Sequence, residues 1–193
     1  NNKEYYFTSE GVMVRGWHKE NDKWKYYSPK KMSVYGRTFV EGEKVTGWLP
    51  INDKWYYIAE DGYMVTGIYK VGNRKYLFME DGSMKTGWFK VDDTWYYISS
   101  DGELRAQWVK SLSNWYYVDV DGKMVTGYQT INGAKYYFAS SGLMQKDWFK
   151  INGEDYYAAS SGTIQAQWVK SGRNWYYVDT DGKMVTGDYI IDG

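Results

Sequence analysis

The chain has 193 residues, with 24 basic and 24 acidic side chains and no cysteine. A net charge of zero argues against a nucleic-acid partner, and the lack of cysteine excludes disulfides and cysteine-ligated metals while leaving the compartment open. No apolar run is long enough to span a membrane, and the 22 Tyr and 11 Trp exceed what one aliphatic core could use, so the aromatic surplus must pack between repeated units or meet a ligand.

A 20-residue repeat organises most of the sequence. The clearest copies are QWVKSLSNWYYVDVDGKMVTG, residues 107–127, and QWVKSGRNWYYVDTDGKMVTG, residues 167–187. A turn glycine returns every 20 residues, at Gly62, Gly82, Gly102, Gly122, Gly142, Gly162 and Gly182. A fixed period of this size is typical of a repeat architecture in which each unit buries its apolar surface against its neighbours.

The N-terminal part is irregular. Residues 1–16 match the end of a unit, and a new unit opens at Trp17 with Trp24 seven residues later. Trp17 and Trp48 are 31 residues apart, so this unit carries about 11 extra residues within the region of about 25–46. We expect a bulged or elongated hairpin there. Because the chain begins with neither Met nor a signal peptide, we expect a mature protein or an excised fragment.

From residue 47 each unit is predicted to form a β-hairpin and a connecting turn. In the first regular unit, residues 48–51 and 54–58 are the expected strands, joined by a two-residue turn at Asn52 and Asp53. This turn pairs 51 with 54 and 48 with 57, which places Trp48, Trp55 and Tyr57 on one face. A lone hairpin is marginal in water, so the hairpins must stack into a solenoid. We therefore expect residues 1–193 to form a single all-β domain.

The two faces of the hairpin vary differently between units. The first Tyr of the WYY motif occurs in every regular unit, which is typical of a core position. The Trp positions are filled in pairs, at 17/24, 48/55, 88/95, 108/115 and 168/175, and are lost in pairs at Ile68/Lys75 and Tyr128/Lys135. Only the unit of Trp148 and Asp155 is half filled. A scaffold that needed Trp would not tolerate these losses, so the pair indicates a binding function.

Two indoles and a neighbouring Tyr can form a three-walled aromatic box. Such boxes bind quaternary ammonium groups, because the ring faces are electronegative and a methylated cation loses little hydration on entering. The structural alternative is that the Trp pairs only pack between repeats, and the correlated losses argue against it.

The pattern GW-x₆-WYY-x₄-DGxMxTG resembles the choline-binding repeats of pneumococcal-type surface proteins and of related bacterial and phage cell-wall hydrolases. The resemblance covers nearly the whole chain. It implies a left-handed solenoid of β-hairpins that binds choline, as phosphocholine on teichoic or lipoteichoic acid, in cavities between successive hairpins. It also implies a secreted protein at the bacterial cell surface or cell wall. In the family each cavity takes both Trp from one unit and the second Tyr of WYY from the next, with the DGxM Met or Leu as an apolar wall.

The resemblance predicts choline-binding residues in five units. They are Trp108, Trp115, Tyr137 and Met124; Trp88, Trp95, Tyr117 and Leu104; Trp48, Trp55 and Met64; Trp17, Trp24 and Tyr57; and Trp168, Trp175 and Met184.

Three of these sites, and three other units, carry exceptions. Leu77 stands where the site of Trp48 and Trp55 needs a Tyr, and Tyr57 serves Trp17 only if the extra residues leave the stacking intact. The site of Trp168 lacks a following WYY and stays open unless another molecule closes it. The units opening at Ile68 and Tyr128 should be empty, and Asp155 should disable the unit of Trp148.

The sequence predicts a binding module and no enzyme. His18, the sole histidine, fits a surface position, and most carboxylates stand in turn positions where Asp favours the backbone geometry. We expect no cofactor and no metal. A carbohydrate-binding repeat, such as a glucan-binding module, and the binding half of a cell-wall hydrolase stay open as alternatives. A host protein and self-association through the C-terminal unit stay open as further partners.

Overall fold

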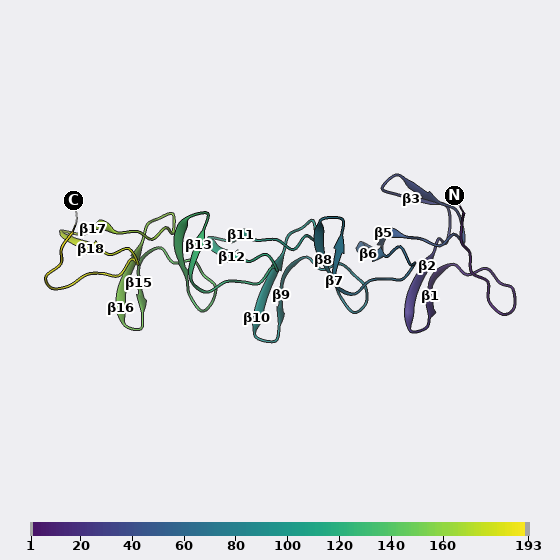
Figure 1. The fold of residues 1–193 in the computed structure, drawn as a ribbon, viewed down its shortest axis with the longest axis horizontal. Helices are drawn as coiled ribbons and strands as arrows, with labels where there is room; N and C mark the ends of the chain where they lie inside the picture. Colours follow the sequence, from purple (N-terminus) through teal and green to yellow (C-terminus); the bar gives the residue numbers. More distant parts are fainter. Residues whose placement is uncertain (1, 192–193) are drawn as a thin grey trace. The chain divides into compact units, whose positions relative to one another are not determined.

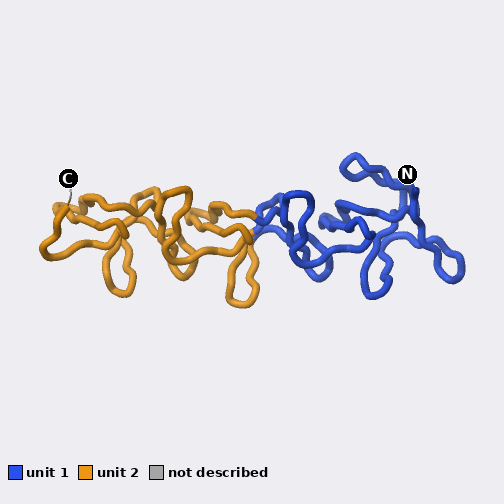
Figure 2. The backbone as a smooth tube through the Cα atoms, in the orientation of Figure 1, with its two compact units in different colours: residues 1–87, 98–104 blue, residues 88–97, 105–193 orange. Residues whose placement is uncertain are grey.

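A computed structural model describes residues 2–191, and within this range the regular structure is β-strand alone, arranged as nine two-stranded antiparallel hairpins (Figure 1). The backbone divides into two compact units (Figure 2), the first with residues 1–87 and 98–104 and the second with residues 88–97 and 105–193. The all-β hairpin solenoid predicted from the repeat is confirmed. The single domain stays a prediction.

The strands are short and nearly uniform in length. Those of the first unit are β1 Gly16–Glu20, β2 Lys23–Tyr27, β3 Met32–Val34, β4 Arg37–Phe39, β5 Gly47–Ile51, β6 Lys54–Ile58, β7 Gly67–Val71 and β8 Arg74–Phe78. The following strands are β9 Gly87–Val91, β10 Thr94–Ile98, β11 Gln107–Ser111, β12 Asn114–Val118, β13 Gly127–Ile131, β14 Ala134–Phe138, β15 Asp147–Ile151, β16 Glu154–Ala158, β17 Gln167–Ser171 and β18 Asn174–Val178.

The two-residue turn sets the register of each hairpin. Between β5 and β6, Asn52 and Asp53 have φ values of 49° and 61°, which suit the twist of the flanking strands. Ile51 pairs with Lys54 and Trp48 with Tyr57, as the sequence predicts. Side chains alternate along a strand, so this register places both indoles of the hairpin on one face.

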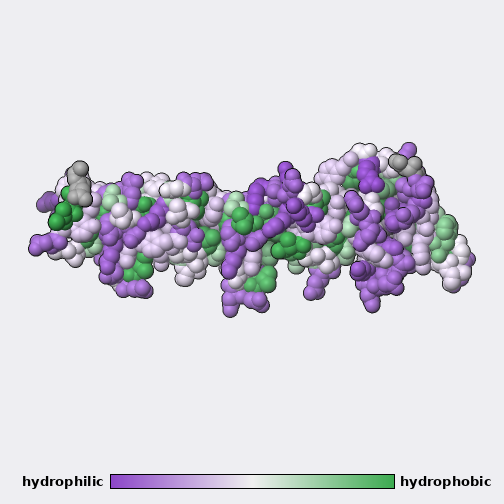
Figure 3. Space-filling model, viewed as in Figure 1, coloured by the Kyte–Doolittle hydropathy of each residue, from purple (hydrophilic) through white to green (hydrophobic). Residues whose placement is uncertain are grey.

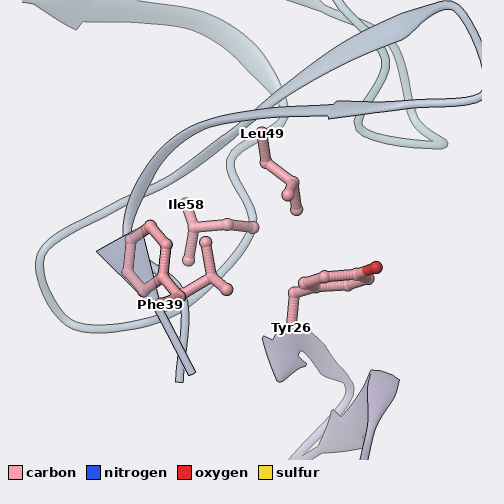
Figure 4. Packing of buried hydrophobic residues seen from close by; sticks show 5 residues of the cluster. Tyr26, Phe39, Leu49 and Ile58 are labelled. Atoms are coloured by element: carbon pink, nitrogen blue, oxygen red, sulfur yellow. The ribbon is translucent and has the colours of Figure 1, made fainter. Parts of the chain in front are cut away.

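A side chain that is almost fully buried follows the WYY position in each regular unit. These residues are at most 1% exposed: Ile58, Phe78, Ile98, Val118, Phe138, Ala158 and Val178. In the first unit, Ile58 and Leu49 extend toward Tyr26 and Phe39 (Figure 4). Burial of apolar surface in these small clusters replaces the single large core that the sequence could not supply.

Consecutive hairpins are also joined by backbone hydrogen bonds. The backbone N–H of the Met in the DGxM motif, or of the residue that replaces it, donates to the carbonyl oxygen at the second Trp position of the preceding regular hairpin. The N···O distances are 2.7–2.9 Å. The bonds run from Met64 to Trp24, Met84 to Trp55, Leu104 to Lys75, Met124 to Trp95, Met144 to Trp115, Ile164 to Lys135 and Met184 to Asp155. The bond forms whether or not Trp is present. The scaffold therefore does not depend on the indoles.

The extra residues near the N-terminus form a separate short hairpin, β3–β4, and the β1–β2 hairpin keeps the ordinary length. The bulged or elongated hairpin expected from the sequence is therefore wrong. Phe39, from β4, is 3% exposed and packs with Leu49 and Ile58, so the insertion adds to the core of the first unit.

The visible surface is largely hydrophilic and is interrupted by separate hydrophobic patches (Figure 3). Within residues 2–191 no helix has the length and apolar composition needed to cross a membrane.

Candidate functional site: aromatic cavities between hairpins

The two Trp of one hairpin stand nearly at right angles. In β11–β12 Trp108 pairs with Tyr117 and Lys110 pairs with Trp115, so the two indoles lie diagonally on one face. Their ring centroids are 6.3 Å apart and their planes meet at 87°. The same arrangement, at 6.2–6.4 Å and 80–85°, occurs in three other pairs: Trp17 and Trp24, Trp48 and Trp55, and Trp88 and Trp95.

A third aromatic ring comes from the next hairpin, and it is the first Tyr of WYY. The ring of Tyr136 lies 4.9 Å from that of Trp108 at 71°. Equivalent contacts at 4.8–5.4 Å join Trp17 to Tyr56, Trp48 to Tyr76, and Trp88 to Tyr116. The extra residues before β5 thus leave the stacking of Trp17 on the next regular hairpin intact.

The second Tyr of WYY, predicted as the third wall, lies elsewhere. Tyr137 packs on Tyr128 and stacks on Phe149, with centroid distances of 4.9 and 5.5 Å. Tyr117 and Tyr57 contact the first Trp of their own hairpins, Trp108 and Trp48. The reason is strand alternation. Tyr136 and Tyr137 lie on opposite faces of β14, and the ring contacts show that the face of Tyr136 meets Trp108 of the preceding hairpin.

The apolar wall is likewise displaced by one unit from the prediction. Met144 lines the cavity of Trp108 and Trp115, for which Met124 was predicted. Met124 lines the cavity of Trp88 and Trp95, for which Leu104 was predicted.

The remaining Met predictions shift in the same way. Met64 lines the cavity of Trp17 and Trp24 instead of that of Trp48 and Trp55. Leu104 and Met184 are bonded through their N–H groups to Lys75 and Asp155, in hairpins without a Trp pair.

Three cavities combine a Trp pair, a Tyr and a Met. Their volumes are about 270, 390 and 300 Å³ for the pairs Trp17/Trp24, Trp88/Trp95 and Trp108/Trp115. Polar side chains complete the linings: Asp81 in the first, Ser111 and Ser141 in the second, and Ser161 in the third. Asp81, Ser141 and Ser161 come from turns two units further along the chain, and Ser111 is the last residue of β11 in the next hairpin, so the pattern within one unit does not predict them.

A larger cavity, of about 460 Å³, lies beside Trp24 and has a different character. Charged side chains line much of it, among them Lys19, Lys23, Asp61 and Glu80, and it contains no pair of indoles. Its chemistry is that of a polar groove, so we do not assign it to the repeated site.

The pair Trp48 and Trp55 also has a third aromatic partner from the next hairpin. Tyr76 supplies the third ring, 4.8 Å from Trp48. The residue predicted for this wall, Leu77, is not aromatic. A further ring comes from the inserted hairpin, because Tyr35 lies 5.6 Å from Trp55 at an angle of 31°.

In two units without a complete Trp pair, the charged residue at the second Trp position forms an ion pair. Lys135 stands at the second Trp position and its Nζ lies 2.6 Å from Oδ1 of Asp181. The Tyr128 hydroxyl donates to the Asp181 carbonyl at 2.9 Å. In the half-filled unit, Lys150 pairs with Asp155 at 2.7 Å.

The last Trp pair is open to solvent. Trp168 is 59% exposed and Trp175 is 61% exposed, whereas Trp108 and Trp115 are partly buried. Trp168 packs on Tyr177 of its own hairpin at 5.1 Å.

The carboxylate at the first cavity is ionised at neutral pH. Hydrogen bonds from Ser83, first from its hydroxyl and then from its backbone N–H, together with the Lys54 ammonium 3.0 Å away, lower the pKa of Asp81 to about 2. Among the described residues, no group of three or more His, Cys, Asp or Glu side chains is placed to hold a metal ion.

The repeats match known sequence families. The model described as "Choline-binding repeat" matches residues 1–34, 45–77, 65–108 and 125–166, and the model described as "Putative cell wall binding repeat" matches residues 107–124 and 167–184. The chain belongs to the choline-binding repeat family. No curated protein sequence matches it.

Solved structures of Streptococcus pneumoniae proteins share the fold. CbpJ of strain TIGR4 is 33% identical with a TM-score of 0.79, and choline binding protein F is 33% identical with a TM-score of 0.77. Choline binding protein F has also been solved in the presence of a peptidoglycan analogue, a tetrasaccharide-pentapeptide, with the same identity and TM-score. Each match covers 94% of this chain and 61% of the other, so the chain spans about three fifths of the length of these proteins.

Proposed function

We propose that this chain attaches non-covalently to the bacterial cell wall by holding the choline groups of teichoic or lipoteichoic acid in the cavities between its hairpins. The observation that carries the proposal is the recurrence of one constellation, an orthogonal pair of indoles closed by a Tyr and a Met of the next hairpin. Membership of the choline-binding repeat family and the structural likeness to choline binding protein F support it. The protein would therefore work at the cell surface.

The chemistry of the cavity suits a quaternary ammonium group. Its walls are π faces and a polarisable thioether, which attract a cation that cannot donate hydrogen bonds. Each ring contributes roughly 0.5–2 kcal/mol, so three rings give about −4 kcal/mol, or a dissociation constant near the millimolar level. The binding is weak at one site and reversible.

Ligand titration followed by Trp fluorescence tests the proposal. Choline should saturate the signal, and Trp115→Ala should remove the response of one cavity. Lys135→Ala is the matched control, because Lys135 occupies the same position in a hairpin without a Trp pair. A response to isomalto-oligosaccharides alone would instead favour the carbohydrate-binding alternative, and no response to choline well above millimolar concentration would overturn the proposal.

A further inference from the structure

The three aromatic cavities share their apolar walls but differ at one equivalent lining position, and the second cavity has Ser111 in addition. The residue directly before the turn glycine reaches the cavity, and it is Asp81 beside Trp24, Ser141 beside Trp95 and Ser161 beside Trp115. One cavity therefore has an anionic lining group where the other two have neutral hydroxyls.

We propose that the Asp or Ser at this turn position sets the charge preference of each cavity, so that the cavity of Asp81 selects a bare quaternary ammonium over one that carries a nearby phosphate. The inference rests on the proposed function and makes the cavities unequal. The cavities with Ser141 and Ser161 accept phosphocholine, because a hydroxyl can donate a hydrogen bond to the phosphate.

The hairpin of Tyr128 shows independently what a carboxylate at this turn position can contact. There Lys135 replaces the second Trp, and its ammonium lies 2.6 Å from Oδ1 of Asp181, the residue before Gly182. A carboxylate at this turn position therefore reaches a cation that sits at the second Trp position. Asp81 occupies the matching place relative to Trp24, so its carboxylate lies within range of a cation held against that indole.

Asp81 stays ionised while it performs this role. Hydrogen bonds from Ser83 and the nearby Lys54 keep the pKa of Asp81 at about 2, so its charge is constant at all ordinary pH values. Lys54 pairs with it at 3.0 Å and partly offsets its field, and both side chains are more than half exposed. The effect on binding is therefore modest, about two- to fivefold at low ionic strength, and it is screened by salt.

Indole N–H resonances in ¹⁵N-labelled protein report each cavity separately within one sample. Choline and phosphocholine are titrated in turn at low salt, and the ratio of their dissociation constants is read at Trp24, Trp95 and Trp115. The dissociation constant of phosphocholine divided by that of choline should be about two- to fivefold higher at Trp24 than at Trp95 or Trp115. In about 0.5 M salt the ratios at the three indoles should become equal, because salt screens the carboxylate.

A reciprocal exchange supplies the matched variants. Asp81→Ser should lower the ratio at Trp24 to that of the other cavities, and Ser161→Asp should raise the ratio at Trp115 alone. Both residues already occur at this turn position elsewhere in the chain, so the turns should fold in both variants. Equal ratios at all three indoles in the wild type, or ratios that the exchange does not move, would overturn this inference. If choline shifts none of the indole resonances, the proposed function is overturned instead.

Discussion

At the scale of the residue, the two adjacent Tyr of the WYY motif have different roles because they lie on opposite faces of a strand. Tyr136 faces the indoles of the previous hairpin, 4.9 Å from Trp108, whereas Tyr137 stacks on Phe149. The residue that varies least between units is thus a wall of the cavity. We interpreted its constancy in the sequence as a core position; the structure buries Tyr76 in a core cluster, and Tyr136 is partly buried.

This difference yields a matched test with neighbouring residues. Tyr136→Leu should remove one aromatic wall and weaken choline binding at Trp115 by about 0.5–2 kcal/mol, or roughly 2–30-fold. Tyr137→Leu keeps all three rings of that cavity, so its dissociation constant there should stay within about twofold of the wild type. Site-resolved titration of the Trp115 indole measures both. The reverse pattern would restore the original assignment of Tyr137 as the wall.

At the scale of the element, the turn glycine couples one hairpin to the cavity of another. Gly142 has a φ of +77°, and a Cβ added there would lie 2.2 Å from the sulfur of Met124. Met124 lines the cavity of Trp88 and Trp95. Gly142 therefore serves two purposes, a left-handed backbone and space for the methionine of the preceding turn, and Gly82, Gly102 and Gly162 do the same.

Gly142→Ala should therefore affect both stability and binding. The left-handed backbone costs an L-residue about 1–2 kcal/mol, and displacing the flexible end of Met124 adds about 1 kcal/mol. Gly127→Ala is the control, because Gly127 has a φ of +70° but nothing within 4 Å of the added Cβ. Urea unfolding should show the larger loss for Gly142→Ala, and only this variant should alter choline binding at Trp95. Equal losses in the two variants would contradict the packing role.

The sequence determined the hairpin more fully than the contacts between hairpins. The two-residue turn and strand alternation sufficed for the register of β5–β6 and for the shared face of Trp48 and Trp55. Strand alternation also predicts that Tyr56 lies on the face opposite the indoles. It does not say which face of one hairpin contacts the preceding hairpin. The displaced Met and the lining Asp81 depend on contacts one and two units along the chain, which no local pattern specifies. The inserted hairpin β3–β4 lies outside the period altogether.

At the scale of the whole molecule, the proposed choline cavities would together make attachment strong only toward a polymer that presents choline repeatedly. The cavities of Trp88/Trp95 and Trp108/Trp115 belong to the same compact unit, so one chain offers at least two sites of this kind. When two such sites engage one polymer, the second binding event is intramolecular and avidity rises by about 10²–10⁴-fold.

Surface binding at different choline densities tests this multivalency. On a dense choline surface the wild type should be retained about 10²–10⁴-fold more tightly than millimolar single-site binding allows, and free choline should release it. Trp95→Ala should reduce retention on the dense surface far more than on a sparse one, where single contacts dominate. Equal retention at both densities would mean that the cavities act alone.

The most direct measurement is a crystal structure of the protein with choline bound. We expect the trimethylammonium group between Trp108, Trp115 and Tyr136, within about 6 Å of each ring centroid and against Met144. A cavity that stays empty at saturating choline, or a ligand bound beside Tyr137 instead, would contradict the account.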